Sequence, residues 1–169
     1  MYNKFKPLVL LFAILCTFNL IAQESSVAGD ALKSKKEIVE EAKAQVEKMS
    51  VDELKAMMEE DESFQLVDVR TEAEYLAGHI QGAKWIPRGK LEFAIQSIAQ
   101  DPNAKLILYC RSGSRSALSV VSVMDMGYEK VYNLTGGFKE WTEAGNHAFN
   151  MHGEFAVIAF EKKEAKEER

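Results

Sequence analysis

The sequence is poor in cysteine, has no excess of positive charge and contains no zinc-binding motif. Its two cysteines form no CxxC pair and no HExxH sequence occurs, so we predict no structural zinc. His147 and His152, five positions apart, are too weak a pair to indicate any other metal. With 21 Lys and Arg against 26 Asp and Glu, the net charge is −5, and no basic field exists to attract nucleic acid.

Long apolar runs are also absent, apart from one short stretch near the start. Residues 8–22 are mostly apolar, but they include Thr17 and Asn19 and are fewer than the roughly 20 that a membrane-spanning helix needs. The whole chain has 169 residues, 47% of them hydrophobic and 28% charged, which is typical of one globular domain with extensions.

Residues 1–23 have the layout of a secretory signal peptide. Lys4 and Lys6 precede the apolar stretch, Ala22 stands near the expected cut, and the sequence turns hydrophilic at Glu24. We therefore expect export, to the periplasm or out of the cell. Contact with a membrane is expected only if this segment is uncleaved or lipidated.

Lipidation would have to use Cys16, and the bulky Leu15 before it disfavours that alternative. Cleavage after residue 22 or 23 removes two Lys and leaves 19 Lys and Arg against 26 Asp and Glu, a net charge of −7. It also leaves Cys110 as the only cysteine, unable to form an internal disulfide. A lone thiol in an oxidising compartment is a reactive group, which favours a function for Cys110.

The remaining sequence alternates between helix and strand patterns. A charged extension over 24–49 carries a helix predicted at 31–49 with a narrow apolar stripe, and a Ser50–Glu53 capping box starts another helix. Further helices are predicted at 51–60, 90–100, 116–126 and 138–144, and strands at 64–69, 83–86, 106–109 and 130–134. This order predicts an α/β fold with a parallel sheet of about four to five strands flanked by helices on both faces.

Beyond this domain, assigned to residues 50–146, lies a C-terminal extension over 147–169. Its apolar stretch at 154–160 is a possible edge strand, and a highly charged tail follows.

Cys110 is the candidate nucleophile. It stands where the strand at 106–109 ends and a short loop runs into a helix, so backbone N–H groups and the helix N-terminus can stabilise its thiolate. Gly113, flanked by Ser112 and Ser114, lets the loop amides converge on an anion. Arg111 and Arg115 add donors suited to an oxyanion such as thiosulfate or phosphate.

Three other polar residues are predicted to support the structure around the site. We predict that Asp68 and Arg70 form an ion pair at the end of a strand, and that His79 is a hydrogen-bonded structural residue rather than a general base.

Three motifs in order resemble those of the single-domain rhodanese-like sulfurtransferases. They are LVDVR at 66–70 with EY and GHIQGA at 74–83, YCRSGSRS at 109–116, and GG at 136–137 with Trp141. The resemblance covers about residues 50–145. It implies a rhodanese-like fold and a persulfide on Cys110, with no cofactor.

The same resemblance implies a reaction and its partners. Thiosulfate or another sulfane donor would load Cys110, and cyanide or a thiol, such as that of a thioredoxin-like protein, would accept the sulfur. The loop residues Arg111, Ser112, Gly113, Ser114 and Arg115 would hold the donor anion and the persulfide.

Two alternatives stay open. Cysteine-based phosphatases and arsenate reductases place an Arg six positions after the cysteine, whereas here that position is Ser116 and the Arg is Arg115. A non-catalytic rhodanese-like binding module in the cell envelope is the other alternative, although such domains typically lack the cysteine.

Overall fold

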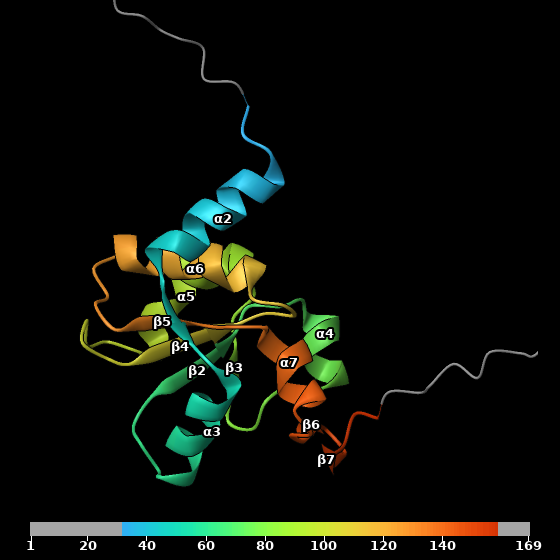
Figure 1. Ribbon diagram of the computed structural model, residues 1–169. Coiled ribbons are helices and arrows are strands. Elements are labelled where there is room, and N and C mark those ends of the chain that lie inside the picture. Colours follow the sequence, from blue (N-terminus) through green and yellow to red (C-terminus); the bar gives the residue numbers. More distant parts are fainter. Residues whose placement is uncertain (1–31, 159–169) are drawn as a thin grey trace, which may run out of the picture. The chain divides into compact units, whose positions relative to one another are not determined.

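Five parallel strands form the central sheet of the computed structural model, which describes residues 32–158 (Figure 1). The strand order is β1-β5-β4-β2-β3, and neighbouring strands are parallel throughout. The strands are β1 (Glu47–Met49), β2 (Gln65–Asp68), β3 (Lys84–Trp85), β4 (Leu106–Tyr109) and β5 (Val131–Leu134). The predicted α/β class with a parallel sheet is confirmed.

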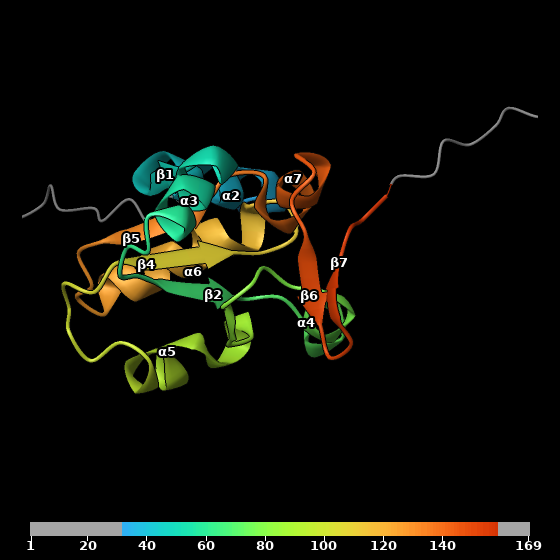
Figure 2. The ribbon, with the colours of Figure 1, turned by 90° about the horizontal axis from the view of Figure 1, so that it is seen from below.

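Helices cover both faces of the sheet, and each face has its own apolar core. On one face lie α2 (Lys35–Gln45), α5 (Leu91–Ala94) with its 3-10 turns at Arg88–Lys90 and Ile95–Ser97, and α6 (Ser114–Asp125). On the other lie α3 (Val51–Glu59) and α7 (Gly137–Glu143). The short α4 (Glu72–Ala77) lies beyond the carboxyl ends of the strands (Figure 2).

The register of the sheet brings two chain segments to the same edge. β2 pairs with β4 so that Asp68 stands opposite Tyr109, where both strands end. Cys110 follows Tyr109 directly, and Arg70 follows Asp68 by two positions. The segments predicted to carry the site therefore meet at the carboxyl edge of the sheet, where open α/β folds bind ligands.

The predicted helix at 31–49 is too long at both ends, and this expectation is corrected: α2 begins only at Lys35, after the N-cap Ser34. Helix α2 ends at Gln45, and residues 47–49 form the edge strand β1 beside β5. Val46 belongs to the core on one face of the sheet and Met49 to the core on the other. In a helix these residues, three apart, would share a face, whereas an extended chain can send them to opposite faces.

The possible edge strand at 154–160 is also corrected as far as residue 158, since residues 159–160 lie outside the described residues. Strand β7 (Gly153–Phe155) pairs antiparallel with β6 (Ala148–Asn150) as a separate hairpin and does not join the central sheet. A turn at residues 151–152 brings the two strands together, and the Asn150 side chain accepts the His152 N–H at 2.8 Å. Pairing with a neighbour across a tight turn closes a shorter loop than pairing with the sheet would. Figure 2 shows this C-terminal hairpin beside α4.

The predicted helix at 90–100 is broken. One turn of α-helix, α5, stands between two 3-10 turns, and Ala94 has φ −116°. Leu91 and Ile95 are nevertheless fully buried, as their helical spacing predicts.

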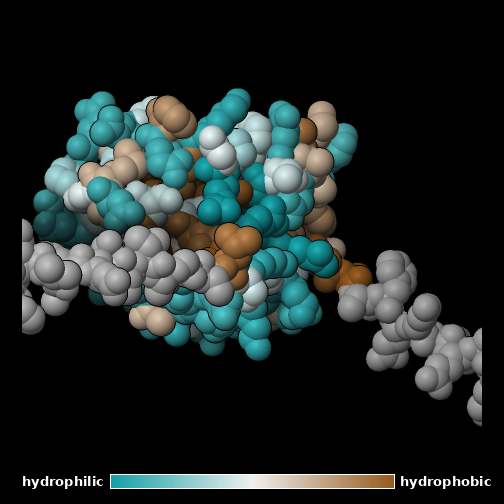
Figure 3. Space-filling view, turned by 90° about the horizontal axis from the view of Figure 1, so that it is seen from above, coloured by the Kyte–Doolittle hydropathy of each residue, from teal (hydrophilic) through white to brown (hydrophobic). Residues whose placement is uncertain are grey.

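Hydrophilic residues predominate on the face seen from above (Figure 3). Within residues 32–158, no helix is both long and apolar enough to cross a bilayer. The signal peptide predicted at 1–23 and the charged tail after residue 160 lie outside the described residues.

Candidate active site around Cys110

The Cys110 loop (residues 110–113) connects β4 to α6 in one tight turn. Gly113 caps α6 with φ +85°, a left-handed conformation that glycine adopts without strain. The loop's outer side is fixed by α7, whose Phe138 and Lys139 N–H groups donate to the carbonyls of Cys110 at 2.8 Å and Arg111 at 3.0 Å. With these carbonyls turned toward α7, the loop's own amides are free to face the sulfur.

Gly137, at the start of α7, makes this contact possible. It has φ +59°, and a Cβ at this position would come 2.3 Å from the carbonyl oxygen of Cys110. Any side chain here would push α7 away from the Cys110 loop. This close contact explains why the second residue of the GG motif is glycine.

The sulfur of Cys110 lies on the floor of a cradle of hydrogen-bond donors. Burial, which raises a thiol pKa, is outweighed by the Ser116 hydroxyl and by the backbone N–H groups of Ser116, Ser112 and Arg115, so the pKa is lowered from 9.0. Cys110 is only 1% exposed and belongs to the apolar core on the α6 face of the sheet. Its sulfur nevertheless has the hydrogen-bond donors named above beside it.

Ser116 can donate its hydroxyl proton in two directions. Its Oγ lies 3.5 Å from the sulfur of Cys110 and 2.6 Å from Oδ1 of Asn133 on β5. A hydroxyl carries one proton, so these two donations are alternatives. An ionised sulfur favours the first.

Arg115 does not point freely into the site. Its guanidinium makes a two-point ion pair with the carboxylate of Glu74, at 2.8 and 2.7 Å. Arg115, together with a hydrogen bond from Thr71, lowers the pKa of Glu74 to about 2 although partial burial opposes this. The thiolate of Cys110 in turn helps to raise the pKa of Arg115, after the larger effect of Glu74. Glu74 thus anchors Arg115 close to the sulfur.

The other residues expected to bind the substrate occupy different positions. Arg111 and Ser112 are exposed at the tip of the Cys110 loop, Gly113 is buried beneath it, and Ser114 is half-buried at the start of α6. Of these, Ser112 directs its amide at the sulfur. The side chain of Arg111 faces a cavity beside the loop.

Asp68 and Arg70 form the expected ion pair, and both side chains are buried. Asp68 accepts from Nε of Arg70 at 2.9 Å and from its terminal nitrogen at 2.6 Å, and that nitrogen also donates to the carbonyl of Gly78 at 2.7 Å. The guanidinium lies over the rings of Phe138, 4.2 Å from the centroid, and Tyr109, at 5.5 Å. The pair joins the ends of β2 and β4 to α7 beneath the loop.

His79 is held by local contacts. Its ring stacks on Tyr75, with 4.0 Å between the ring centroids, and Nδ1 lies 3.1 Å from the Tyr75 carbonyl. Its backbone exchanges two hydrogen bonds of 2.9 Å with Phe149 of the C-terminal hairpin.

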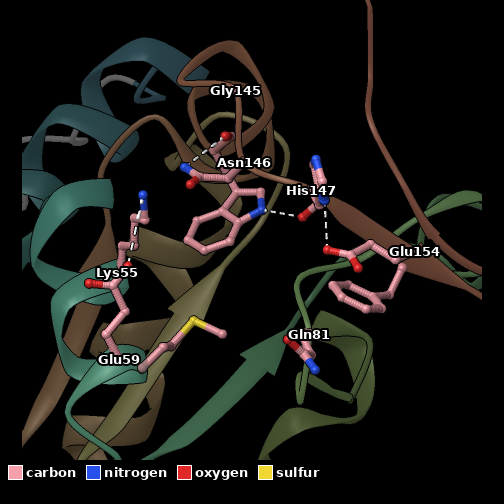
Figure 4. Close-up of a pocket in the computed structure, with 10 residues that line it drawn as sticks. Lys55, Glu59, Gln81, Gly145, Asn146, His147 and Glu154 are labelled. Carbon is pink, nitrogen blue, oxygen red and sulfur yellow. Dashed lines mark hydrogen bonds and ion pairs between the residues drawn. The ribbon is translucent and has the colours of Figure 1, made fainter.

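A second cavity, about 460 Å³, lies between α3, α7 and the C-terminal hairpin (Figure 4). His147 is paired there with Glu154 at 2.6 Å, and its carbonyl accepts the Trp141 indole N–H at 2.8 Å. No residue of the Cys110 loop lines this cavity. Across residues 32–158 there is no group of three His, Cys, Asp or Glu side chains placed to hold a metal.

Several residues that complete the site were not among the candidate site residues predicted from the sequence: Ser116, Asn133, Glu74 and Phe138. A signal existed for Glu74 and Ser116, because both lie within the quoted motifs. No sequence pattern links Asn133 to Cys110, since its contact with Ser116 depends on the pairing of β4 with β5.

The family model of the rhodanese-like domain matches residues 50–144, more than half of the chain. The chain therefore belongs to the rhodanese-like domain family, and its curated relatives include sulfurtransferases. The α2 helix, β1 and the C-terminal hairpin all lie outside the matched segment.

Two relatives and one solved structure illustrate the similarity. A sulfurtransferase of Allochromatium vinosum is 33% identical over 59% of this chain and 92% of its own length. Thiosulfate sulfurtransferase 18 of Arabidopsis thaliana is 32% identical over 64% of this chain and 86% of its own length. A Rhodopseudomonas palustris protein of unknown function, described as a possible tyrosine phosphatase, matches with a TM-score of 0.64 and 30% identity, over 69% of this chain and 94% of its own.

Other relatives are longer than the shared region. The chain spans 63% of a curated relative from Bacillus subtilis, at 29% identity, and 26% of one from Erwinia tasmaniensis, at 34% identity. These matches concern the shared domain.

Proposed function

We propose that this protein is a sulfurtransferase that takes a sulfane sulfur from thiosulfate or a related donor, carries it on Cys110 as a persulfide and passes it to a thiol or cyanide. The observation that carries the proposal is the position of Cys110 between the end of β4 and the start of α6, with the Ser116 hydroxyl 3.5 Å from its sulfur. This hydroxyl and the backbone N–H groups of Ser112, Arg115 and Ser116 lower the pKa of Cys110 despite its burial. Donors placed in this way stabilise negative charge on the thiolate, which the proposed nucleophile needs.

The proposed reaction has two half-reactions. The Cys110 thiolate attacks the outer sulfur of thiosulfate, the sulfur–sulfur bond of the donor breaks, and sulfite leaves with the bonding electron pair. An acceptor thiolate then attacks the outer sulfur of the persulfide, and the electron pair of the broken bond returns to Cys110. Neither step needs an external oxidant or reductant, and ping-pong kinetics are expected.

The two Arg side chains take different parts in this proposal. Arg111, exposed at the loop tip, meets the anionic end of the donor. Arg115, held by Glu74, supplies fixed positive charge near the sulfur and presents its own amide to it. We therefore assign Arg115 to positioning and charge stabilisation rather than to first contact with the donor.

The similarity to a possible tyrosine phosphatase supports a second candidate, phosphate ester hydrolysis. It is less favoured because the Cys110 loop leaves only three residues between the cysteine and α6. The Arg115 guanidinium, which a phosphate would need, is also occupied by Glu74. A non-catalytic binding module remains the other alternative.

Intact-protein mass after incubation with thiosulfate tests the proposal. One added sulfur atom is expected, mapped by peptide mass to Cys110. Cys110→Ser should lose both the gain and thiocyanate formation from cyanide. A wild-type protein that gains no sulfur contradicts the mechanism, and turnover of p-nitrophenyl phosphate instead would favour the phosphatase.

Export remains part of the proposal, supported by the layout of residues 1–23. We expect the mature protein, isolated from the cell envelope or the medium, to begin near residue 23 or 24. A mature protein that keeps residues 1–22 would contradict cleavage. A thiol acceptor in that compartment, small or thioredoxin-like, is proposed with it.

A further inference from the structure

A cavity of about 320 Å³ opens beside the Cys110 loop, and part of its wall lies outside the family's matched segment. Arg111 contributes from the loop, Gly78 from the end of α4 and Phe138 from α7. Phe155 and Val157, at the end of the C-terminal hairpin and just after it, complete the wall.

The C-terminal hairpin is fixed in this position by specific contacts. Phe149 and His79 exchange two backbone hydrogen bonds of 2.9 Å. The ring of Phe155 lies against Gly78, since a Cβ on that glycine would come 2.7 Å from Cζ of the ring. The Phe155 ring therefore forms part of the cavity wall.

The charges around the cavity are unequal. Arg70 is paired with Asp68 at 2.6 Å and Glu74 with Arg115 at 2.7 Å, so these groups largely neutralise one another. Arg111 is exposed and has no ion-pair partner within residues 32–158. The cavity thus combines apolar walls with one uncompensated positive charge, carried by the residue that follows Cys110 in the loop.

We propose that this cavity binds the sulfur acceptor, and that the acceptor is a small thiol with an apolar body and a carboxylate. The inference rests on the proposed function and specifies its second substrate. The carboxylate pairs with Arg111, and the hydrocarbon lies against Phe138, Phe155 and Val157. The volume is at the low end of the range for ligand pockets, about 300 to 1,000 Å³, which favours a small molecule over a protein segment.

The chemistry of the step follows directly. The acceptor thiolate attacks the outer sulfur of the Cys110 persulfide, the new sulfur–sulfur bond forms on the acceptor, and the electron pair of the old bond returns to Cys110. The acceptor leaves as a persulfide anion, and the enzyme thiolate is restored.

A series of three thiols tests the proposal in single-turnover reactions. Protein loaded with thiosulfate and desalted is mixed with 6-mercaptohexanoate, 6-mercaptohexan-1-ol or 3-mercaptopropanoate, and loss of the added sulfur is followed by mass. We expect 6-mercaptohexanoate to react about tenfold faster than the short acid, because its additional methylene groups are partly removed from water. The carboxylate of 6-mercaptohexanoate can pair with Arg111, so it should also react faster than the neutral alcohol. This advantage should be only about threefold, because an exposed ion pair contributes little.

Three variants locate this preference. Phe155→Ala and Val157→Ser should each reduce the advantage of 6-mercaptohexanoate over the short acid at least threefold, with sulfur loading from thiosulfate unchanged. Val157 lies after the last strand of the hairpin, so its substitution should leave the folding of the hairpin unchanged. Met151→Ala is the matched control, since this residue sits at the hairpin turn, is 85% exposed and does not line the cavity.

A binding measurement separates failure of this proposal from failure of the proposed function. Hexanoate, which has no thiol, is titrated into Cys110→Ser protein, and the amide NMR signals of Gly78 and Phe155 are expected to shift. If thiosulfate fails to load Cys110 but hexanoate shifts these signals, the proposed function falls and the ligand class stands.

Two outcomes would overturn the acceptor proposal. In one, loading succeeds but the three thiols react within a factor of two and hexanoate causes no shifts. In the other, a reduced thioredoxin-like protein discharges the persulfide rapidly while the small thiols show no preference, which would assign the surface to a protein.

Discussion

Glu74→Gln should destabilise the protein by removing the carboxylate that holds Arg115. The pKa of Glu74 is about 2 in the folded protein against an ordinary 4.5. At about 1.36 kcal/mol per pKa unit this difference is at most ~3.4 kcal/mol. The Arg115 and Glu74 side chains are 37% and 30% exposed, so solvent screening reduces the expected loss at pH 7 to about 1 to 2 kcal/mol. Glutamine keeps the capping bond to Thr71, so the cap contributes little to the difference.

The dependence on pH has a defined sign. A carboxyl group whose folded pKa is lowered stabilises the protein above its unfolded pKa, and this contribution is lost as the pH falls toward the folded pKa. The difference between wild type and Glu74→Gln should be constant above about pH 5.5 and fall by about half near pH 3. Urea unfolding at several pH values measures it.

The control for this prediction is Glu72→Gln, an exposed residue in the first turn of the same helix. Its effect should be no more than about 0.5 kcal/mol. Equal losses for the two variants, or a Glu74→Gln loss that does not shrink in acid, would refute the assignment of the Glu74–Arg115 pair.

Three further predictions concern the loop and its supports. The alkylation rate of Cys110 by iodoacetamide should rise with pH and reach half its plateau below pH 9.0, because the pKa of Cys110 is lowered; Ser116→Ala should move this midpoint upward. Gly137→Ala should cost at least ~2 kcal/mol in urea unfolding, since it combines a positive φ with a Cβ 2.3 Å from the Cys110 carbonyl oxygen. Asp68→Leu should cost about 3 to 5 kcal/mol in the same assay, because it leaves the Arg70 guanidinium buried without its partner.

Each of these predictions has a matched control. Ser122→Ala, on the same helix as Ser116 but bonded only to the Leu118 carbonyl, should leave the alkylation midpoint unchanged. Gly89→Ala adds a Cβ with nothing within 4 Å, and Asp52→Asn alters an exposed carboxylate of α3. A shift with Ser122→Ala, or losses with the last two equal to those of Gly137→Ala and Asp68→Leu, would contradict the proposed causes.

The sequence predicted the parts of the fold that depend on local patterns. The strand at 106–109 and the capping box at Ser50 are both present with the predicted residues, because buried runs and caps are fixed by neighbours in sequence. β1 was missed because its three residues make a strand only beside β5, some 85 positions later. Its charged sequence alone resembles the end of a helix.

The site shows the same division. Cys110 and the neighbouring loop amides could be predicted, because the strand, the loop and the helix that place them are consecutive in the sequence. The partner of Arg115 could not be read from spacing, because Glu74 is 41 positions away and meets it only through the sheet. The contribution of Phe155 likewise depends on how the C-terminal hairpin folds back onto α4.

The early strand β1 and the helix before it have a practical consequence for anyone who expresses this domain alone. A fragment trimmed to the family boundary at residue 50 would leave β5 with an open hydrogen-bonding edge and would uncover apolar side chains that Val39, Ala42 and Val46 now bury. Open edges and bare apolar faces invite self-association. The smallest fragment expected to stay monodisperse begins near Ser34, at the capping box of α2.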